Sequence, residues 1–146
     1  RKIGLSGGAA AHREIADMRA AVGALRKSNA GGFGEMEPCL AEAVDALERA
    51  TAFMLDASTT RPNDALAGAT PYLRLFAYAR GGTALARGAL AAHRLSTAGN
   101  SDSALPARIA MARFFAENTA TGAGGLEREV TRGAGSVHAS AAVLGQ

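Results

Sequence analysis

The sequence predicts an all-α protein in which four long helices form an antiparallel, up-down-up-down bundle with a short fifth helix after them. Three observations carry this prediction. Aromatic residues make up only 5% of the 146 residues and Trp is absent, a composition that favours helix over sheet. Apolar residues recur at steps of three and four over long segments. Short links rich in Gly, Ser and Asn separate these segments. We treat residues 1–146 as a single helical domain.

The first two helices are expected over residues 8–28 and 35–57. An extended lead-in over residues 1–7 precedes them, with a turn at Ser6, Gly7 and Gly8. Ile15, Met18, Val22 and Leu25 form one apolar face of the first segment. Residues 29–32 then end that helix, because Asn and Gly tolerate left-handed backbone angles. In the second segment Pro38 falls in the first turn, where a missing N–H costs least.

Residues 63–95 predict the central helix of the bundle, because they carry two apolar stripes. One stripe consists of Leu66, Ala69, Leu73, Phe76, Ala77, Ala84, Gly88, Ala91 and Leu95. The other consists of Leu75, Tyr78, Gly82, Leu85, Ala89 and Ala92. A helix with two apolar faces is expected to be covered on more than one side.

Glycines and a proline interrupt this central segment. Gly81, Gly82 and Gly88 each weaken an isolated helix by about 1 kcal/mol, so they predict a neighbouring backbone that approaches too closely for a Cβ. Pro71 lacks an N–H and predicts either a kink near residues 66–69 or a helix that restarts at Thr70.

Two further helices are expected after a polar loop over residues 96–103. The fourth helix covers about residues 102–119, with Leu105, Ile109, Ala112, Phe115, Ala116 and Thr119 facing inward. The Gly-rich segment 121–125 ends it. The short fifth helix covers about residues 126–133 and buries Leu126 and Val130. Residues 133–146 are mostly small, and we expect a weak final turn or a frayed tail.

Charge and cysteine content narrow the classes of partner. The net charge of +3, from 16 basic and 13 acidic residues, is mild, and the two signs alternate along the chain, so we expect no nucleic acid as a partner. Arg74, Arg80 and Arg87 break the longest apolar run, which excludes a membrane span there.

Cys39 is the single cysteine and allows no internal disulfide, which favours a cytoplasmic location. The chain begins with Arg1 and not Met, which fits a piece of a longer polypeptide.

The residues predict no catalytic, cofactor-binding or metal-binding site within this chain. His12, His93 and His138 lie far apart and lack a carboxylate at ligand spacing, so surface imidazoles are the simplest interpretation. Cys39 sits near a helix start, where the dipole can lower a thiol pKa. A buried or half-buried thiol is the preferred interpretation, because no His is nearby. Gly-Gly pairs do not stand between a strand and a helix, as phosphate binding requires.

Arg80, Arg87 and Arg94 are spaced by seven residues and therefore lie on one helix face. A solvated stripe is the simple interpretation. The alternative is that the stripe docks on an acidic surface of a partner domain.

Several segments together resemble a known domain. These are Arg1-Lys2, residues 7–10, residues 67–76 (Ala-Gly-Ala-Thr-Pro-Tyr-Leu-Arg-Leu-Phe), Gly81-Gly82, residues 85–87 and residues 112–117 (Ala-Arg-Phe-Phe-Ala-Glu). Over nearly the whole chain they resemble the C-terminal helical domain of the acyl-CoA dehydrogenase family, in the branch of 3-methylmercaptopropionyl-CoA dehydrogenase-like enzymes. The sequence departs from that pattern at Thr83, where an aromatic residue is common, and at Arg80, where an apolar residue is expected.

The resemblance implies a parent flavoprotein that uses FAD to oxidise the Cα–Cβ bond of an acyl-CoA thioester. The glutamate base and the flavin contacts of such enzymes lie upstream of the position that matches Arg1, so none is carried onto this chain. The implied role is structural: packing against the upstream dehydrogenase core and supporting a homo-oligomer, with no FAD bound by this chain alone. The alternative is a stand-alone helical protein-interaction module without catalysis.

Overall fold

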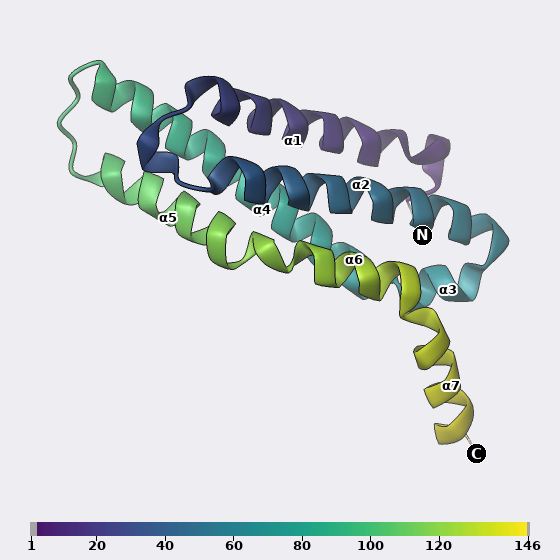
Figure 1. The fold of residues 1–146 in the computed structure, drawn as a ribbon. Coiled ribbons are helices and arrows are strands. Elements are labelled where there is room, and N and C mark those ends of the chain that lie inside the picture. Colours follow the sequence, from purple (N-terminus) through teal and green to yellow (C-terminus); the bar gives the residue numbers. More distant parts are fainter. Residues whose placement is uncertain (1–2, 146) are drawn as a thin grey trace.

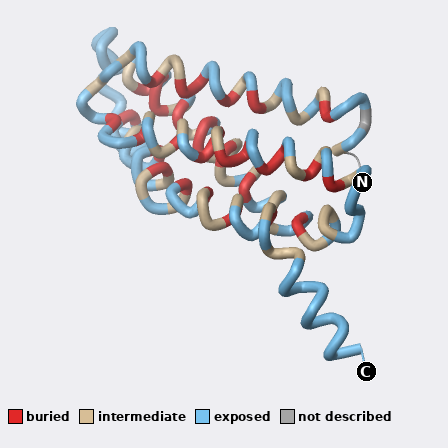
Figure 2. The backbone as a smooth tube through the Cα atoms, turned by 45° about the vertical axis from the view of Figure 1, so that its right-hand side comes forward, coloured by how far each residue is buried: buried red, intermediate tan, exposed pale blue. Residues whose placement is uncertain are grey.

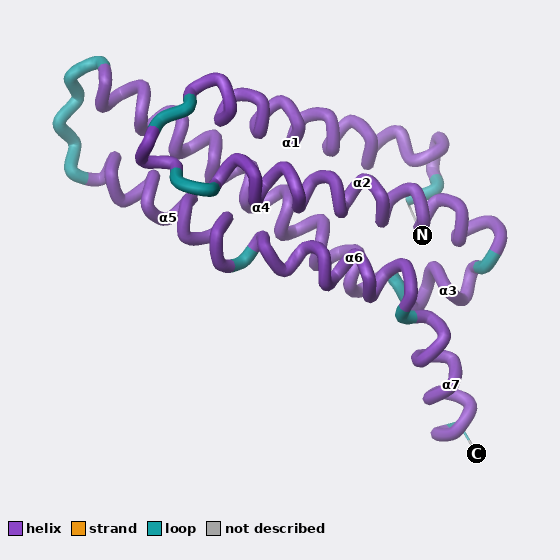
Figure 3. Tube along the Cα trace, viewed as in Figure 1, coloured by secondary structure: helices purple, strands orange, loops and turns teal. Residues whose placement is uncertain are grey.

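All regular elements of the computed structural model are helices, and residues 3–145, which the structure describes, contain no strand (Figures 1 and 3). The α-helices are α1 (Ala9–Ser28), α2 (Met36–Thr60), α3 (Pro62–Ala67), α4 (Ala69–Thr97), α5 (Ala104–Asn118), α6 (Ala123–Arg132) and α7 (Ala134–Leu144). Short 3₁₀ turns cover Leu5–Gly8, Gly31–Phe33 and Ala120–Gly122. The all-α prediction is confirmed.

The long helices lie alongside one another, with α2 between α1 on one side and α5 and α6 on the other, and with α4 behind (Figure 1). In this view α5 and α6 continue each other almost end to end. In contrast, α7 leaves the body of the molecule near α3 and projects away from it (Figure 2).

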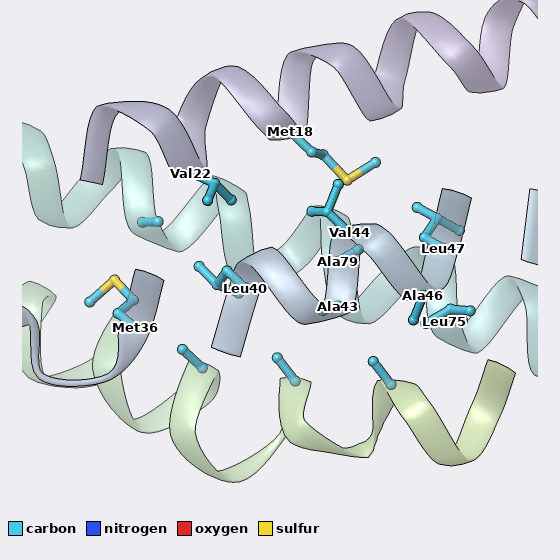
Figure 4. Packing of buried hydrophobic residues seen from close by; sticks show 14 of the residues in the cluster. Met18, Val22, Met36, Leu40, Ala43, Val44, Ala46, Leu47, Leu75 and Ala79 are labelled. Carbon is cyan, nitrogen blue, oxygen red and sulfur yellow. The ribbon is translucent and has the colours of Figure 1, made fainter. Parts of the chain in front are cut away.

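The core forms around α2, which is buried along most of its length. Its buried residues are Met36, Leu40, Ala43, Val44, Ala46, Leu47, Ala50, Thr51, Met54 and Ala57. Figure 4 shows Met18 and Val22 of α1 and Leu75 and Ala79 of α4 converging on this helix. The many alanines keep side chains short where helices meet, so that the helix axes can approach closely.

Ion pairs at the rim join the neighbouring helices to α2. Arg19 of α1 lies 2.8 Å from Asp45 and also pairs with Glu48. Arg49 of α2 lies 2.7 Å from Glu127 of α6. Because these arginines are about half exposed, each pair contributes at most about 1 kcal/mol, and the apolar core provides most of the stability.

The prediction that residues 63–95 form one helix with two covered apolar faces is wrong. The chain divides that segment into α3 and α4. The central position is supported, because α4 packs against α1, α2, α5 and α6, but one side of α4 stays exposed. On α4 the buried residues are Leu75, Ala79, Gly82, Thr83, Ala86, Ala89, Leu90 and Ala92. Most of the other predicted stripe is exposed, including Leu66 (74%), Leu73 (70%) and Leu95 (47%). Only one apolar stripe of α4 therefore enters the core.

The predicted break before Pro71 is confirmed, and α4 begins at Ala69. Gly68 stands at the break and is buried; a Cβ there would lie 3.2 Å from the Val130 carbonyl oxygen and 3.3 Å from the Met54 sulfur. Pro71 falls in the first turn of α4, where its missing N–H costs little.

The close approach predicted at the α4 glycines is confirmed in part. A Cβ at Gly82 would collide with the Leu40 side chain and lie 3.4 Å from the Phe115 ring. The neighbours are therefore side chains, and the predicted neighbouring backbone is wrong there. Gly88 has open space around its Cβ position, so that prediction is also wrong. Thr83 is buried beside Gly82 and donates a 2.8 Å hydrogen bond to the Ala79 carbonyl, which explains how a small polar residue is accommodated there.

The ends of the chain agree with the expectations only in part. Arg1 and Lys2 of the predicted lead-in lie outside the described residues, and the turn predicted at Ser6, Gly7 and Gly8 is confirmed as part of the 3₁₀ turn Leu5–Gly8. Gly124 and Gly125 belong to α6 and not to a linker. Leu126 and Val130 are buried as predicted. The frayed tail is wrong, because α7 is an 11-residue helix, although it has no buried residue.

Two leucines on α4 test which stripe is in the core. Replacing Leu75, which is fully buried, by Ala is expected to lower the free energy of unfolding by about 2 to 5 kcal/mol, because it removes buried methyl groups and leaves a cavity. Replacing Leu73 by Ala is expected to change it by no more than about 0.5 kcal/mol. Urea unfolding of the two variants measures both values, and equal losses would contradict the orientation of α4.

Candidate interaction surface

An apolar surface without cover runs along α4 and α5 on the side away from α2. We call it the α4–α5 face and define it by its exposed apolar residues, which are Leu73, Ala77, Ala84, Ala91, Leu95, Ala107, Met111 and Phe114. Phe114 is 65% exposed and Met111 is 61% exposed. Several exposed large apolar side chains on one side of a protein are typical of a surface that contacts a partner.

A groove of about 380 Å³ lies within this face, between α4 and α5. Ala84, Leu85 and Gly88 line it from α4, and Ala107 and Met111 line it from α5. Arg108 is the one charged side chain of the lining. Because the α4 lining is made mainly of Ala and Gly, a partner helix or side chain can approach the α4 backbone closely.

The predicted arginine stripe lies beside this face, and α1 engages two of its three members. Arg80 Nε lies 3.1 Å from Glu14, and its Nη1 donates a 3.1 Å hydrogen bond to Asp17. Arg87 Nη2 lies 2.7 Å from the Asp17 carboxylate and also donates to its backbone oxygen at 2.9 Å. The position of Arg80, where an apolar residue was expected, is therefore explained by a contact with α1.

Other arginines near the α4–α5 face form no ion pair within the described part of the chain. Among residues 3–145 no ion pair involves Arg94, Arg74 or Arg108. Moreover, α4 contains no acidic residue, and Glu117 of α5 is engaged by Arg113 at 2.8 Å. The unpaired charges carried by α4 and α5 are therefore positive, which favours an acidic partner surface.

A comparison with models of protein families identifies the family of this chain. A family model described as "Acetyl-CoA dehydrogenase C-terminal like" matches residues 11–140, which include most of α1, all of α2 to α6 and the first part of α7. The chain belongs to the acyl-CoA dehydrogenase C-terminal domain family. The search of curated proteins returned no match.

Acyl-CoA dehydrogenases generally use FAD, and the residues of this C-terminal domain do not fit a complete flavin site. Two of its hollows, each of about 380 Å³, have mainly apolar linings. Within residues 3–145, no buried side-chain nitrogen or oxygen lacks a hydrogen-bond partner. The two buried threonines illustrate this, since Thr51 and Thr83 each donate to a carbonyl one helical turn earlier.

The three histidines of the C-terminal domain lie in different environments. His12 is exposed, His93 packs edge-on against Phe33 with ring centroids 5.5 Å apart, and His138 of α7 bonds Asp64 of α3 at 2.9 Å. In the described part of the chain, no three His, Cys, Asp or Glu side chains gather as a metal site would require. Also within that part, no helix is both long enough and apolar enough to cross a membrane.

Cys39 is a half-buried thiol, as the preferred interpretation held. Burial raises its pKa, and the nearby carboxylates of Glu117, Glu35 and Glu42 raise it further. A raised pKa disfavours the thiolate, so the environment of Cys39 opposes nucleophilic reactivity.

Met111 and Phe114 are the surface residues that sequence reasoning missed. It assigned Phe115 inward and used Phe114 only as part of the family resemblance, without a position on the surface. At about 100° per residue, Phe114 lies on the side of α5 opposite to the buried Ala112 and Ala116. This position on the helix is the feature of the sequence from which the exposure of Phe114 could have been predicted.

The contact of α1 with the arginine stripe predicts a pH dependence. The hydrogen bond from Arg87 lowers the pKa of the Asp17 carboxyl, and the charges of Arg87 and Arg80 lower it further. The ionised carboxylate therefore stabilises the fold above about pH 4, and this stabilisation is lost as the pH falls through the lowered pKa. We expect Asp17→Asn to be less stable than the wild type near neutral pH and the difference to close in acid.

Urea unfolding of both proteins from about pH 7 to about pH 3 measures this difference. Glu129→Gln is the control, because this exposed carboxyl has no ion pair among residues 3–145. A gap between wild type and Asp17→Asn that stays constant with pH would show that the carboxylate charge plays no part.

Proposed function

We propose that the chain is the C-terminal helical domain of an acyl-CoA dehydrogenase-like flavoprotein and that its role is structural. In this proposal the α4–α5 face packs against the upstream flavin-binding core. The core supplies FAD binding and the oxidation of an acyl-CoA, as the parent's branch of 3-methylmercaptopropionyl-CoA dehydrogenase-like enzymes implies. The cytoplasmic location and the up-down-up-down arrangement of the helices remain parts of the proposal.

The observation that supports this role most directly is the second apolar stripe of α4. Leu73 and Leu95 are exposed although they repeat with the helical period of a buried face. Exposure of such a stripe to water is unfavourable by about 25 cal/mol per Å² of apolar surface. A partner that covers the stripe removes this cost, so the surface fits a domain that works in contact with another.

The charges around the stripe suggest what this partner presents. Arg74, Arg94 and Arg108 have no ion pair among residues 3–145, whereas Arg80 and Arg87 are already engaged by α1. We therefore propose an apolar patch flanked by Asp or Glu side chains on the partner. Within the predicted stripe of Arg80, Arg87 and Arg94, this gives Arg94 the strongest role in docking.

Binding to the separately expressed, FAD-loaded core of the parent tests the proposal. Leu73→Asp is expected to weaken association by at least about tenfold, since it places a charge in an apolar contact. Arg94→Glu is expected to weaken association and to reduce its salt dependence, because a screened attraction is lost. Isothermal titration calorimetry measures both effects.

Ala16→Asp is the matched control. Ala16 is exposed on α1, and the substitution adds the same charge away from the α4–α5 face. The proposal is wrong if the wild-type chain does not associate with the core, or if Leu73→Asp binds as tightly as Ala16→Asp does. In the first case the stand-alone interaction module becomes the better account.

A further inference from the structure

The helix α7 has an apolar face and almost no cover. It contains no Asp, Glu, Lys or Arg, and none of its residues is buried. Val137 is 50% exposed and Leu144 is 86% exposed. Isolated helices of this length are marginal in water, so a contact that covers α7 would stabilise it.

The apolar side chains of α7 are spaced for packing against a surface. Ala134, Val137, Ala141 and Leu144 follow one another at steps of three, four and three. Residues with this spacing share one side of a helix. Ser136 lies on a different side. Ser140 and His138 border the stripe at its two edges, so the apolar side chains form its centre.

A second hollow lies at the end of the molecule where α7 emerges, and its lining is apolar like the stripe of α7. We call it the α3 hollow; it measures about 380 Å³ and is lined mainly by Ile3, Met54, Pro62, Ala65, Leu66 and Ala69. Ser58 is the one polar side chain of the lining, and its hydroxyl already donates to the Leu55 carbonyl at 2.8 Å. An apolar helix face can enter this hollow without removing a charged group from water.

The α7 helix of the same chain is held away from the α3 hollow. His138 bonds Asp64 at 2.9 Å. At about 100° per residue, Asp64 lies on the opposite side of α3 from Pro62 and Leu66, which line the hollow. The contact that holds α7 on its own α3 therefore leaves the hollow open on the other side.

We propose that the α3 hollow receives the Val137–Leu144 stripe of α7 from a second copy of this chain. Because α7 begins beside α3 (Figure 1), a two-fold axis at this end of the molecule lets each copy give its α7 and receive that of the other. Such an exchange is isologous and closed, so it stops at a dimer. It uses neither the α4–α5 face nor the arginine stripe and is therefore independent of docking on a dehydrogenase core.

Analytical ultracentrifugation of the purified chain tests the exchange. A reversible dimer is expected, and Val137→Asp is expected to weaken it by at least about tenfold because the charge must enter an apolar hollow. Ala139→Asp is the matched control, since Ala139 is exposed and lies on the other side of α7, and it should dimerise as the wild type does. Leu73→Asp should also leave the dimer intact, whereas it weakens core binding.

Cross-linking locates the contact. In a Cys39→Ser background, mixing a Val137→Cys chain with an isotopically labelled Leu66→Cys chain should give a mixed disulfide on mild oxidation. An Ala16→Cys chain should not form one with Val137→Cys. A chain that stays monomeric, a dimer equally sensitive to both α7 charges, or disulfides formed equally with Ala16→Cys would each overturn the proposal.

Discussion

The close packing of neighbouring helices on the buried side of α2 is the constraint on which the other features depend. Ala43, Ala46, Ala50 and Ala57 are completely buried on this helix, and short side chains allow adjacent helices to approach closely. Once α1, α4, α5 and α6 pack against this side of α2, each of these helices has one side in the core. For α4 this leaves the Leu73–Leu95 stripe outside, although it is as apolar as the stripe that is buried. The exposed face is therefore a consequence of how the core is built.

The sequence predicted the helices better than it predicted their orientation. Periodicity located α1, α2 and the buried Leu126 and Val130 of α6, because those faces have a single apolar side. It could not decide which stripe of α4 is buried, since both have the same period and only long-range packing distinguishes them. The partners of Arg80 and Arg87 lie on α1, and α7 meets α3 through residues 74 positions apart; local patterns carry no information on such contacts. The resemblance supplied the family, which periodicity alone could not.

A division of surfaces follows from this arrangement. Arg80 and Arg87 lie between α1 and α4. The arginines without an ion pair that border the apolar α4–α5 face are Arg74, Arg94 and Arg108. The α7 helix, which has no Asp, Glu, Lys or Arg, lies at one end near the α3 hollow. A domain of the acyl-CoA dehydrogenase C-terminal family can thus present one surface to an acidic, apolar partner and a separate one to its own copy. Because the buried polar groups in residues 3–145 are all satisfied internally, the chain contributes shape and contact surface to this account.

Methyl NMR spectroscopy of the isolated chain with a soluble paramagnetic probe tests the exposure of the α4 stripe most directly. Such a probe broadens the signals of methyl groups that solvent reaches. The account predicts strong broadening for Leu73 and Leu95 and little for Leu40, Leu47 and Leu75. Equal protection of Leu73 and Leu75 would contradict it, because α4 would then bury both stripes and no apolar face would remain for a partner.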